Sequence, residues 1–185
     1  MKYLLVLAFV FTLPLSVFAT DYRGNCTIVF QGDSTLHGFQ GKARCQPFTA
    51  SKIDGVVDIS KVSVAVADMD TDNAKRDKKM REMFEEKRFP LITGSAGLVA
   101  LKEIRSVLKK GNDSATVAFK LKIREIVRPV TATVTKFVET DSRITAELAF
   151  TLSLADYRLQ PPSVLGLISV DDKVSVKATV VLEAQ

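Results

Sequence analysis

Residues 69–90 read MDTDNAKRDKKMREMFEEKRFP, and this stretch predicts a helix over about 73–87. Residues 71–73 are of types that favour helix N-caps, and Asp72 would lie near the positive end of the helix dipole. Strong helix formers follow, and Pro90 ends the helix because proline cannot continue it. One face of the helix is half polar and half apolar, and it carries Asn73, Asp77, Met80 and Phe84. We expect this helix to cover part of a molecule that is otherwise built from strands.

After residue 19, the rest of the chain alternates apolar and polar residues with the period of a β-strand. This alternation predicts about eight strands, at residues 26–31, 39–45, 62–66, 91–101, 117–123, 130–134, 144–152 and 174–182. Each strand has one apolar face and one polar face, which is typical of antiparallel sheets. Such strands hide their apolar faces either in an up-and-down barrel or in a two-sheet sandwich. The chain shows no linker or internal repeat, so we expect a single domain at residues 20–185.

The first 19 residues have the pattern of a secretory signal peptide. Lys2 supplies a positive start, residues 4–13 form an apolar core, and residues 17–19 resemble a small-residue cleavage site. The apolar core is shorter than the roughly 20 residues that span a membrane, which disfavours the alternative of an uncleaved anchor. The pattern therefore predicts a mature chain that begins at Thr20 and is periplasmic or secreted.

The two cysteines, Cys26 and Cys45, lie in the expected mature chain, where export places them in an oxidising compartment. We expect one disulfide, which would close a loop of about 20 residues and stabilise the fold by roughly 3 kcal/mol. A hairpin that turns near residues 35–36 would set Cys26 opposite Cys45. The same register pairs further apolar-face residues, Ile28 with Ala43 and Phe30 with Gly41. The disulfide and the hydrophobic pattern therefore predict one common register.

The formal charge is +5 at pH 7, and the basic residues gather around the predicted helix rather than in one long block. These residues are Lys75, Arg76, Lys78, Lys79, Arg81, Lys87 and Arg88, partly offset by Asp77, Glu82, Glu85 and Glu86. One interpretation is a solvated helix face with ion pairs between residues four apart. The other is a cationic rim that faces an anionic head group or a membrane surface. No nucleic-acid partner is expected, because the basic residues lack interleaved aromatic residues.

His37 is the only histidine, and Asp33 and Ser34 lie close to it in sequence, so a hydrolytic triad is one hypothesis. The sequence has no nucleophile elbow, and residues of one tight loop rarely reach triad geometry. We therefore expect no catalytic residue, and we assign His37 either a structural role or a contact at the mouth of a barrel. The sequence also lacks an array of metal ligands and a glycine-rich phosphate loop, so no metal or cofactor is expected.

Four parts of the chain together match the pattern of a known family. They are residues 34–41 (STLHGFQG), 70–84 with 89–90, 128–131 (RPVT), and 154–157 (LADY) with 170–174 (VDDKV). At these residues the chain resembles the YceI-like family of polyisoprenoid-binding proteins, and the resemblance covers nearly all of the expected mature chain. The chain departs from the family pattern at residues 125–127, where a glycine is usual, and at Gly94, where a bulkier residue is common. The cysteine pair is not a general feature of the family.

The resemblance implies an all-β fold, an eight-stranded antiparallel lipocalin-like barrel whose helix at about 73–87 covers or flanks the mouth. It also implies an exported, non-enzymatic binding protein that holds an isoprenoid or similar amphiphilic lipid, polyprenyl or quinone-like, inside the barrel. The apolar strand faces agree with this, but an eight-stranded barrel can also be filled by its own side chains. The alternative is therefore a secreted structural, interaction or stress-related module that has no ligand.

In such a barrel, the ligand is expected to contact inward-facing aromatic residues and the helix residues at the mouth. The expected contacts are Phe30, His37, Phe39, Arg76, Met80, Met83, Phe84, Phe89, Phe119 and Phe150. Arg76 and Asp77 have two interpretations. In the structural one, they form an ion pair between the helix and the barrel body and act as a latch of the fold. In the functional one, they form a polar latch at the mouth, with Arg76 facing a phosphate or quinone head group. The sequence leaves open the identity of the ligand, contact with a membrane surface, and the oligomeric state, a homodimer included.

Overall fold

The computed structural model describes residues 19–34, 37–111, 114–161 and 170–185. Residues 1–18 of the predicted signal peptide and the predicted turn at residues 35–36 lie outside the described residues. The strands are β1 (Thr20–Ser34), β2 (Phe39–Arg44), β3 (Phe48–Ile53), β4 (Val56–Ile59), β5 (Val62–Ala65), β6 (Leu91–Ser95), β7 (Gly97–Ala100), β8 (Ala115–Ile123), β9 (Ile126–Glu139), β10 (Arg143–Ser153) and β11 (Val170–Ala184). The helices are α1 (Ala74–Met83) and α2 (Leu101–Lys109), with short 3-10 turns at Val66–Asp68 and Ala155–Tyr157.

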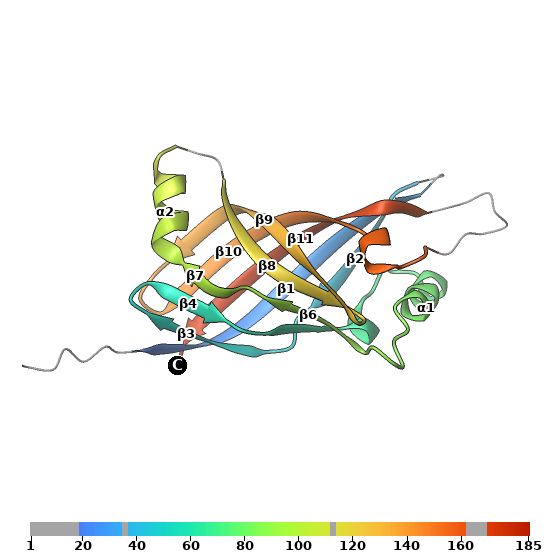
Figure 1. Cartoon of the computed structure of the whole chain (residues 1–185), viewed down its shortest axis with the longest axis horizontal. Helices are drawn as coiled ribbons and strands as arrows, with labels where there is room; N and C mark the ends of the chain where they lie inside the picture. Colours follow the sequence, from blue (N-terminus) through green and yellow to red (C-terminus); the bar gives the residue numbers. More distant parts are fainter. Residues whose placement is uncertain (1–18, 35–36, 112–113, 162–169) are drawn as a thin grey trace, which may run out of the picture.

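The strands pair into a ring, which within the described part of the chain is made of eight chain segments (Figure 1). Three segments are each divided into two strands: β2 with β3, β4 with β5, and β6 with β7. One half of β1 pairs with β2 and the other half with β3. β4 joins β3 to β7, β5 pairs with β6, and a bridge from Cys45 to Val64 links the β2 segment to β5. β6, β8, β9, β10, β11 and β1 complete the ring as antiparallel neighbours.

These eight segments correspond one to one with the eight predicted strands, which confirms the predicted antiparallel barrel class. The strand count differs because eleven strands lie along the eight segments. β3 and β4 were not predicted. They lie in the same two segments as the predicted strands at residues 39–45 and 62–66. They are joined by a tight turn at Asp54 and Gly55, whose φ angles of 51° and 78° suit an Asp-Gly hairpin.

The prediction of one strand over residues 91–101 is wrong at its C-terminal end. β6 ends at Ser95, β7 is short, and α2 begins at Leu101. Gly97 lies at the break with a φ of 59°, a left-handed conformation that glycine adopts without strain. The expectation of a single helix is therefore also wrong. Leu101 and Ile104 are three residues apart and only 4% and 7% exposed, so α2 turns an apolar face inward.

The predicted helix is confirmed as α1, although it is shorter than residues 73–87. Asn73 is the N-cap, and its side-chain oxygen accepts hydrogen bonds from the backbone N–H groups of Lys75 and Arg76, both at 3.1 Å. The chain leaves the helix after Met83, and Glu85 has a φ of 52°. None of the helices in the described residues is long and apolar enough to cross a membrane.

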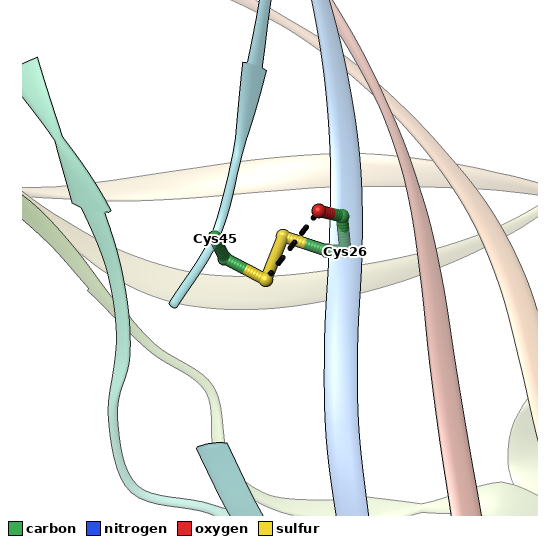
Figure 2. The surroundings of a disulfide bond; sticks show 2 residues. All are labelled: Cys26 and Cys45. Atoms are coloured by element: carbon green, nitrogen blue, oxygen red, sulfur yellow. Dashed lines mark hydrogen bonds between the residues drawn. A yellow bond between two sulfur atoms is a disulfide. The ribbon is translucent and has the colours of Figure 1, made fainter. Parts of the chain in front are cut away.

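The disulfide between Cys26 and Cys45 forms in the predicted register (Figure 2). The two Cα atoms are 5.3 Å apart, and the backbone N–H of Cys45 donates to the carbonyl of Cys26 at 3.1 Å. The predicted neighbouring pairs are also present, with Ile28 opposite Ala43 and Phe30 opposite Gly41. The bond therefore ties the middle of β1 to the end of β2 inside the barrel.

Glycines and phenylalanines face one another across the first strands of the barrel. The three pairs are Gly24 with Phe48, Gly32 with Phe39, and Gly41 with Phe30. A Cβ atom added to any of these glycines would overlap the partner ring. The rings of Phe30, Phe39 and Phe48 therefore lie over bare backbone, and all three line the interior of the barrel.

Candidate functional site

The interior of the barrel holds a cavity of about 330 Å³ whose lining residues extend from α1 to α2. Arg76, Met80 and Met83 of α1 line it at one end, and Leu101 and Ile104 of α2 line it at the other. Figure 1 shows these two helices at opposite ends of the barrel. The cavity therefore follows the long axis of the barrel.

The wall of the cavity is almost wholly apolar because each strand turns its apolar face inward. Among the described residues that line it, only Arg76 and Ser95 have polar side chains. Small residues leave room along the wall, in particular Gly94, Ala132 and Ala178. Ala132 is fully buried, and a Cβ added to Gly94 would come within 4 Å of only one atom, Cδ2 of Phe119 at 3.9 Å.

A buried polar cluster fastens α1 to the chain that precedes it. The Thr71 hydroxyl donates to Oδ1 of Asp77 at 2.5 Å and accepts from Nε of Arg76 at 2.8 Å. The backbone N–H of Thr71 donates to the same carboxylate oxygen at 3.0 Å, and its carbonyl accepts from Nη2 of Arg76 at 2.6 Å. Thr71 and Asp77 are only 2% and 8% exposed, so every one of these bonds replaces a bond to water. This is the polar latch expected of Arg76 and Asp77, with Thr71 as its centre.

The guanidinium of Arg76 also lies on the wall of the cavity, where it could face the head group of a ligand. Its Cζ atom lies 4.8 Å from the centroid of the Phe39 ring, which is cation–π geometry. The bonds to Thr71 use two of the five guanidinium N–H groups, so donors remain for a polar group of a ligand. The latch and the head-group contact are therefore compatible roles for this side chain.

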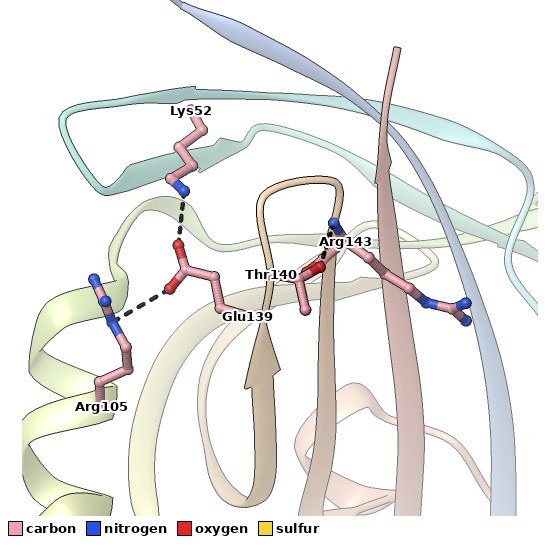
Figure 3. Close-up of polar contacts among 5 residues, drawn as sticks. All are labelled: Lys52, Arg105, Glu139, Thr140 and Arg143. Atoms are coloured by element: carbon pink, nitrogen blue, oxygen red, sulfur yellow. Dashed lines mark hydrogen bonds and ion pairs between the residues drawn. The ribbon is translucent and has the colours of Figure 1, made fainter.

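A second polar cluster lies at the α2 end of the barrel (Figure 3). Nζ of Lys52 on β3 is 2.7 Å from Oε1 of Glu139, and Nε of Arg105 on α2 is 3.2 Å from Oε2. The side chain of Glu139 is 11% exposed, whereas those of Lys52 and Arg105 are 24% and 44% exposed. One carboxylate at the end of β9 thus links α2 and β3.

Eight of the ten predicted contact residues line the cavity. They are Phe30, Phe39, Arg76, Met80, Met83, Phe84, Phe119 and Phe150. The rings of Phe119 and Phe150 meet edge to face at a centroid distance of 5.3 Å. The structure thus brings together residues from β1, β2, α1, β8 and β10 around one space.

His37 and Phe89 are not among the described residues that line the cavity. His37 is exposed, and its backbone carbonyl accepts a hydrogen bond from the Ser34 hydroxyl at 2.6 Å. Phe89 lies near the guanidinium groups of Arg88 and Arg124, 4.8 Å and 5.8 Å from its ring centroid. His37 and Phe89 stay predicted contacts that lie outside the described lining of the cavity.

Several residues at the α2 end of the cavity were not predicted from the sequence. The strand predicted at residues 91–101 includes Leu101 but not Ile104, and Phe48 and Phe137 are not among the predicted contacts. The signal that could have found them is the spacing of Leu101, Ile104 and Leu108, which suits one face of a helix.

Two described groups with a shifted pKa, Tyr157 and Asp172, are not among the residues that line the cavity. Burial raises the pKa of Tyr157, the Asp156 charge adds to the increase, and the Arg128 charge opposes it. Hydrogen bonds from the Ser153 side chain and the Ala155 backbone lower the pKa of Asp172. The described residues include no group of three or more His, Cys, Asp or Glu side chains that could hold a metal ion.

Comparison with known proteins agrees with the barrel architecture. A model of the YceI-like domain matches residues 17–182. The structure of BcnA from Burkholderia cenocepacia superposes with a TM-score of 0.61 at 15% identity, over 84% of this chain and 95% of that chain. A polyisoprenoid binding domain from Saccharophagus degradans, implicated in plant cell wall breakdown, gives 0.61 at 12% identity, over 89% and 98%.

At these identities the two solved structures show a shared fold and nothing further. No curated protein sequence matches the chain significantly. The family model, in contrast, covers nearly all of the barrel, from the residues before β1 into β11. On that match, this chain belongs to the YceI-like family.

Proposed function

We propose that this protein binds one chain-like amphiphilic lipid, of isoprenoid or quinone-like type, inside the barrel, and that it does so as an exported, non-enzymatic carrier. The observation that carries the proposal is the apolar cavity of about 330 Å³ inside the barrel, with a single charged side chain, Arg76, among its described lining residues. Cavities of this size and polarity suit a small ligand that is mostly apolar. The naming of the Saccharophagus degradans domain as polyisoprenoid binding supports the choice of lipid class.

The cavity also favours a ligand over the alternative of a barrel filled by its own side chains. Protein interiors are close-packed, with few voids larger than a water molecule. A closed void of 330 Å³ would cost up to about 8 kcal/mol at about 24 cal/mol per Å³, a large share of the stability of an ordinary domain, and an apolar cavity that is partly open still leaves its wall without packing partners. A bound lipid would recover much of this cost, because it restores apolar contacts to the cavity wall.

The disulfide supports export, since such bonds persist in oxidising compartments. The proposal places the protein in the periplasm or outside the cell. The measurement is the thiol state of Cys26 and Cys45 in protein recovered from each fraction of its own host. Reduced cysteines in protein that stays in the cytosol would contradict export.

The direct test is native mass spectrometry, followed by organic extraction, of protein purified from its own host. We expect a bound species that adds a defined mass and that extracts as a lipid with a long apolar chain. Protein that carries no lipid and takes up no lipophilic fluorophore would contradict the proposal and favour the filled module.

Gly94→Phe is the sharpest variant because the space next to Gly94 is open and lies inside the cavity. We expect this ring to occupy ligand space and to lower lipid uptake at least tenfold while the β fold is kept. Ala118→Phe is the matched control, since Ala118 lies on the exposed face of β8. Gly41 is unsuitable for such a change, because a side chain there would collide with the Phe30 ring. Equal uptake by both variants would count against a site inside the barrel.

A further inference from the structure

The two ends of the cavity differ in polarity. At the α1 end, Arg76 places a guanidinium on the wall. At the α2 end, the lining residues Val99, Leu101, Ile104 and Phe137 are all apolar. An amphiphile with one polar end would therefore lie with that end at Arg76 and with its apolar tail toward α2, since the reverse orientation buries a polar group without a partner.

The helix at the tail end is held in place by contacts with several parts of the barrel. Glu139 on β9 links Arg105 of α2 to Lys52 of β3, at 3.2 Å and 2.7 Å (Figure 3). The backbone N–H of Leu101 donates to the carbonyl of Gly55 at 3.0 Å. On its inner face, α2 packs Ile104 against Ala115 and Val134, and all three residues are buried. The helix is thus a fixed wall, not a loosely attached segment.

We propose that α2 is the stop for the ligand's tail, and that Ile104, with Leu101, sets the longest chain the barrel accommodates in extended form. This inference rests on the proposed function and specifies it: the ligand class is a single unbranched or regularly branched chain with one polar end, selected by length. A tail shorter than the distance from Arg76 to α2 leaves part of the cavity unfilled. A longer tail must fold back or leave methylene groups outside.

The affinity for a series of chains should therefore rise with length and then level off. Each methylene newly buried in the cavity should strengthen binding about fourfold. Beyond the stop, added methylenes gain nothing because they find no further apolar wall. The chain length at which the rise in affinity ends is a measure of the distance from Arg76 to α2. Substitutions of Ile104 should alter this length.

The experiment uses single-chain n-alkyl phosphates that differ by two methylenes, each competing with a lipophilic fluorophore for the full protein after its own lipid is removed. The variants are Ile104→Phe, which adds bulk at the stop, and Ile104→Val, which removes one methyl group and preserves the fold. We expect the plateau to begin at least one step earlier in Ile104→Phe and no earlier than wild type in Ile104→Val. Lys102→Ala, on the exposed side of α2, is the control and should leave the plateau unchanged.

The n-alkyl alcohols of the same lengths test the orientation without altering the protein. If the polar end lies at Arg76, the ratio of phosphate to alcohol affinity exceeds one and stays constant below the plateau. Binding of the series with the same plateau in wild type and Ile104→Phe would overturn the stop but leave the proposed function intact. A wild-type protein that binds no chain of any length would overturn the proposed function itself.

Discussion

At the scale of single residues, Thr71 is the position where most polar contacts of the α1 end converge. Its hydroxyl stands between Nε of Arg76 and the carboxylate of Asp77, and its backbone bonds to both side chains. The sequence predicts a polar latch at Arg76 and Asp77, whereas Thr71 is expected there only as a residue type that favours helix N-caps. Asn73, not Thr71, is the cap. The latch orients Arg76 on the cavity wall, so a contact that stabilises the fold also positions the charged side chain found among the described lining residues.

Thr71→Val tests this latch, because valine keeps the shape of threonine and removes the hydroxyl. The change leaves Nε of Arg76 without its acceptor in a half-buried site, and we expect a loss of about 1–3 kcal/mol in the free energy of unfolding. Urea denaturation measures the loss. Thr116→Val, on the exposed face of β8, is the matched control and should shift the value by less than about 0.5 kcal/mol. Equal effects of the two changes would contradict the latch.

Asp172 gives a prediction of pH dependence at the same scale. Hydrogen bonds from Ser153 and Ala155 lower the pKa of its carboxyl in the folded state. The unfolded chain therefore binds the proton more readily than the folded protein. The contribution of Asp172 to stability is fully present above the pKa of the unfolded state, about 3.9. It is lost as the pH falls through the lower pKa of the folded state. We expect Asp172→Asn to show a shallower loss of stability than wild type between about pH 4 and pH 2. Parallel curves in this window would contradict the assignment.

At the scale of elements, α2 and the strand β7 before it are the main difference from the sequence-based prediction. Residues 91–101 suit one strand in the sequence, and only the first part of this stretch pairs with β8. β7 pairs instead with β4, and α2 leaves the sheet at Leu101. The polar contacts of Glu139 then hold α2 across the end of the barrel.

Glu139→Gln tests how firmly α2 is held. Glutamine keeps the size of the side chain but removes the charge that faces Lys52 and Arg105, and we expect a loss of about 1–2 kcal/mol, since the site is only partly shielded from water. Hydrogen exchange should show amides of α2 opening before those of β10 and β11. Glu183→Gln is the control, because the Arg143–Glu183 pair at 3.8 Å is more than half exposed on both sides. The hypothesis fails if α2 exchanges identically in wild type and Glu139→Gln.

At the scale of the whole molecule, the barrel closes around a cavity that its own side chains do not fill. The long segments β1, β9, β10 and β11 form the continuous part of the wall, while the three divided segments bend around the remaining side. The disulfide ties β1 to the bend after β2, where the ring continues to β5. Lipid uptake should therefore act on the stability of the entire barrel rather than on one element.

We expect a bound chain lipid to raise the midpoint of thermal unfolding, by the equivalent of about 2.7 kcal/mol at a free concentration 100-fold above Kd. Gly94→Phe should lose this ligand-dependent shift, yet unfold without lipid at a temperature no lower than wild type, since its ring fills part of the empty space. Differential scanning calorimetry with and without lipid measures both values. A full ligand shift in Gly94→Phe, equal to that of Ala118→Phe, would place the lipid elsewhere.

The features that depend on local periodicity can be predicted from the amino-acid sequence. The two-residue period placed eight apolar strand faces, residues 69–90 placed α1, and the cysteines with Ile28 and Phe30 predicted the register of β1 and β2. Each of these follows from neighbours along the chain or from one adjacent hairpin.

The features that depend on segments far apart in sequence become visible only in the folded chain. Residues 91–101 suit one continuous strand, and only the pairing of Gly97–Ala100 with β4 reveals the break after Ser95 and the start of α2 at Leu101. The ion pairs of Glu139 need β3, β9 and α2 in one place. The cavity is the space left after the inward side chains of all eight segments are packed, so no local pattern contains its volume or reveals which residue ends it.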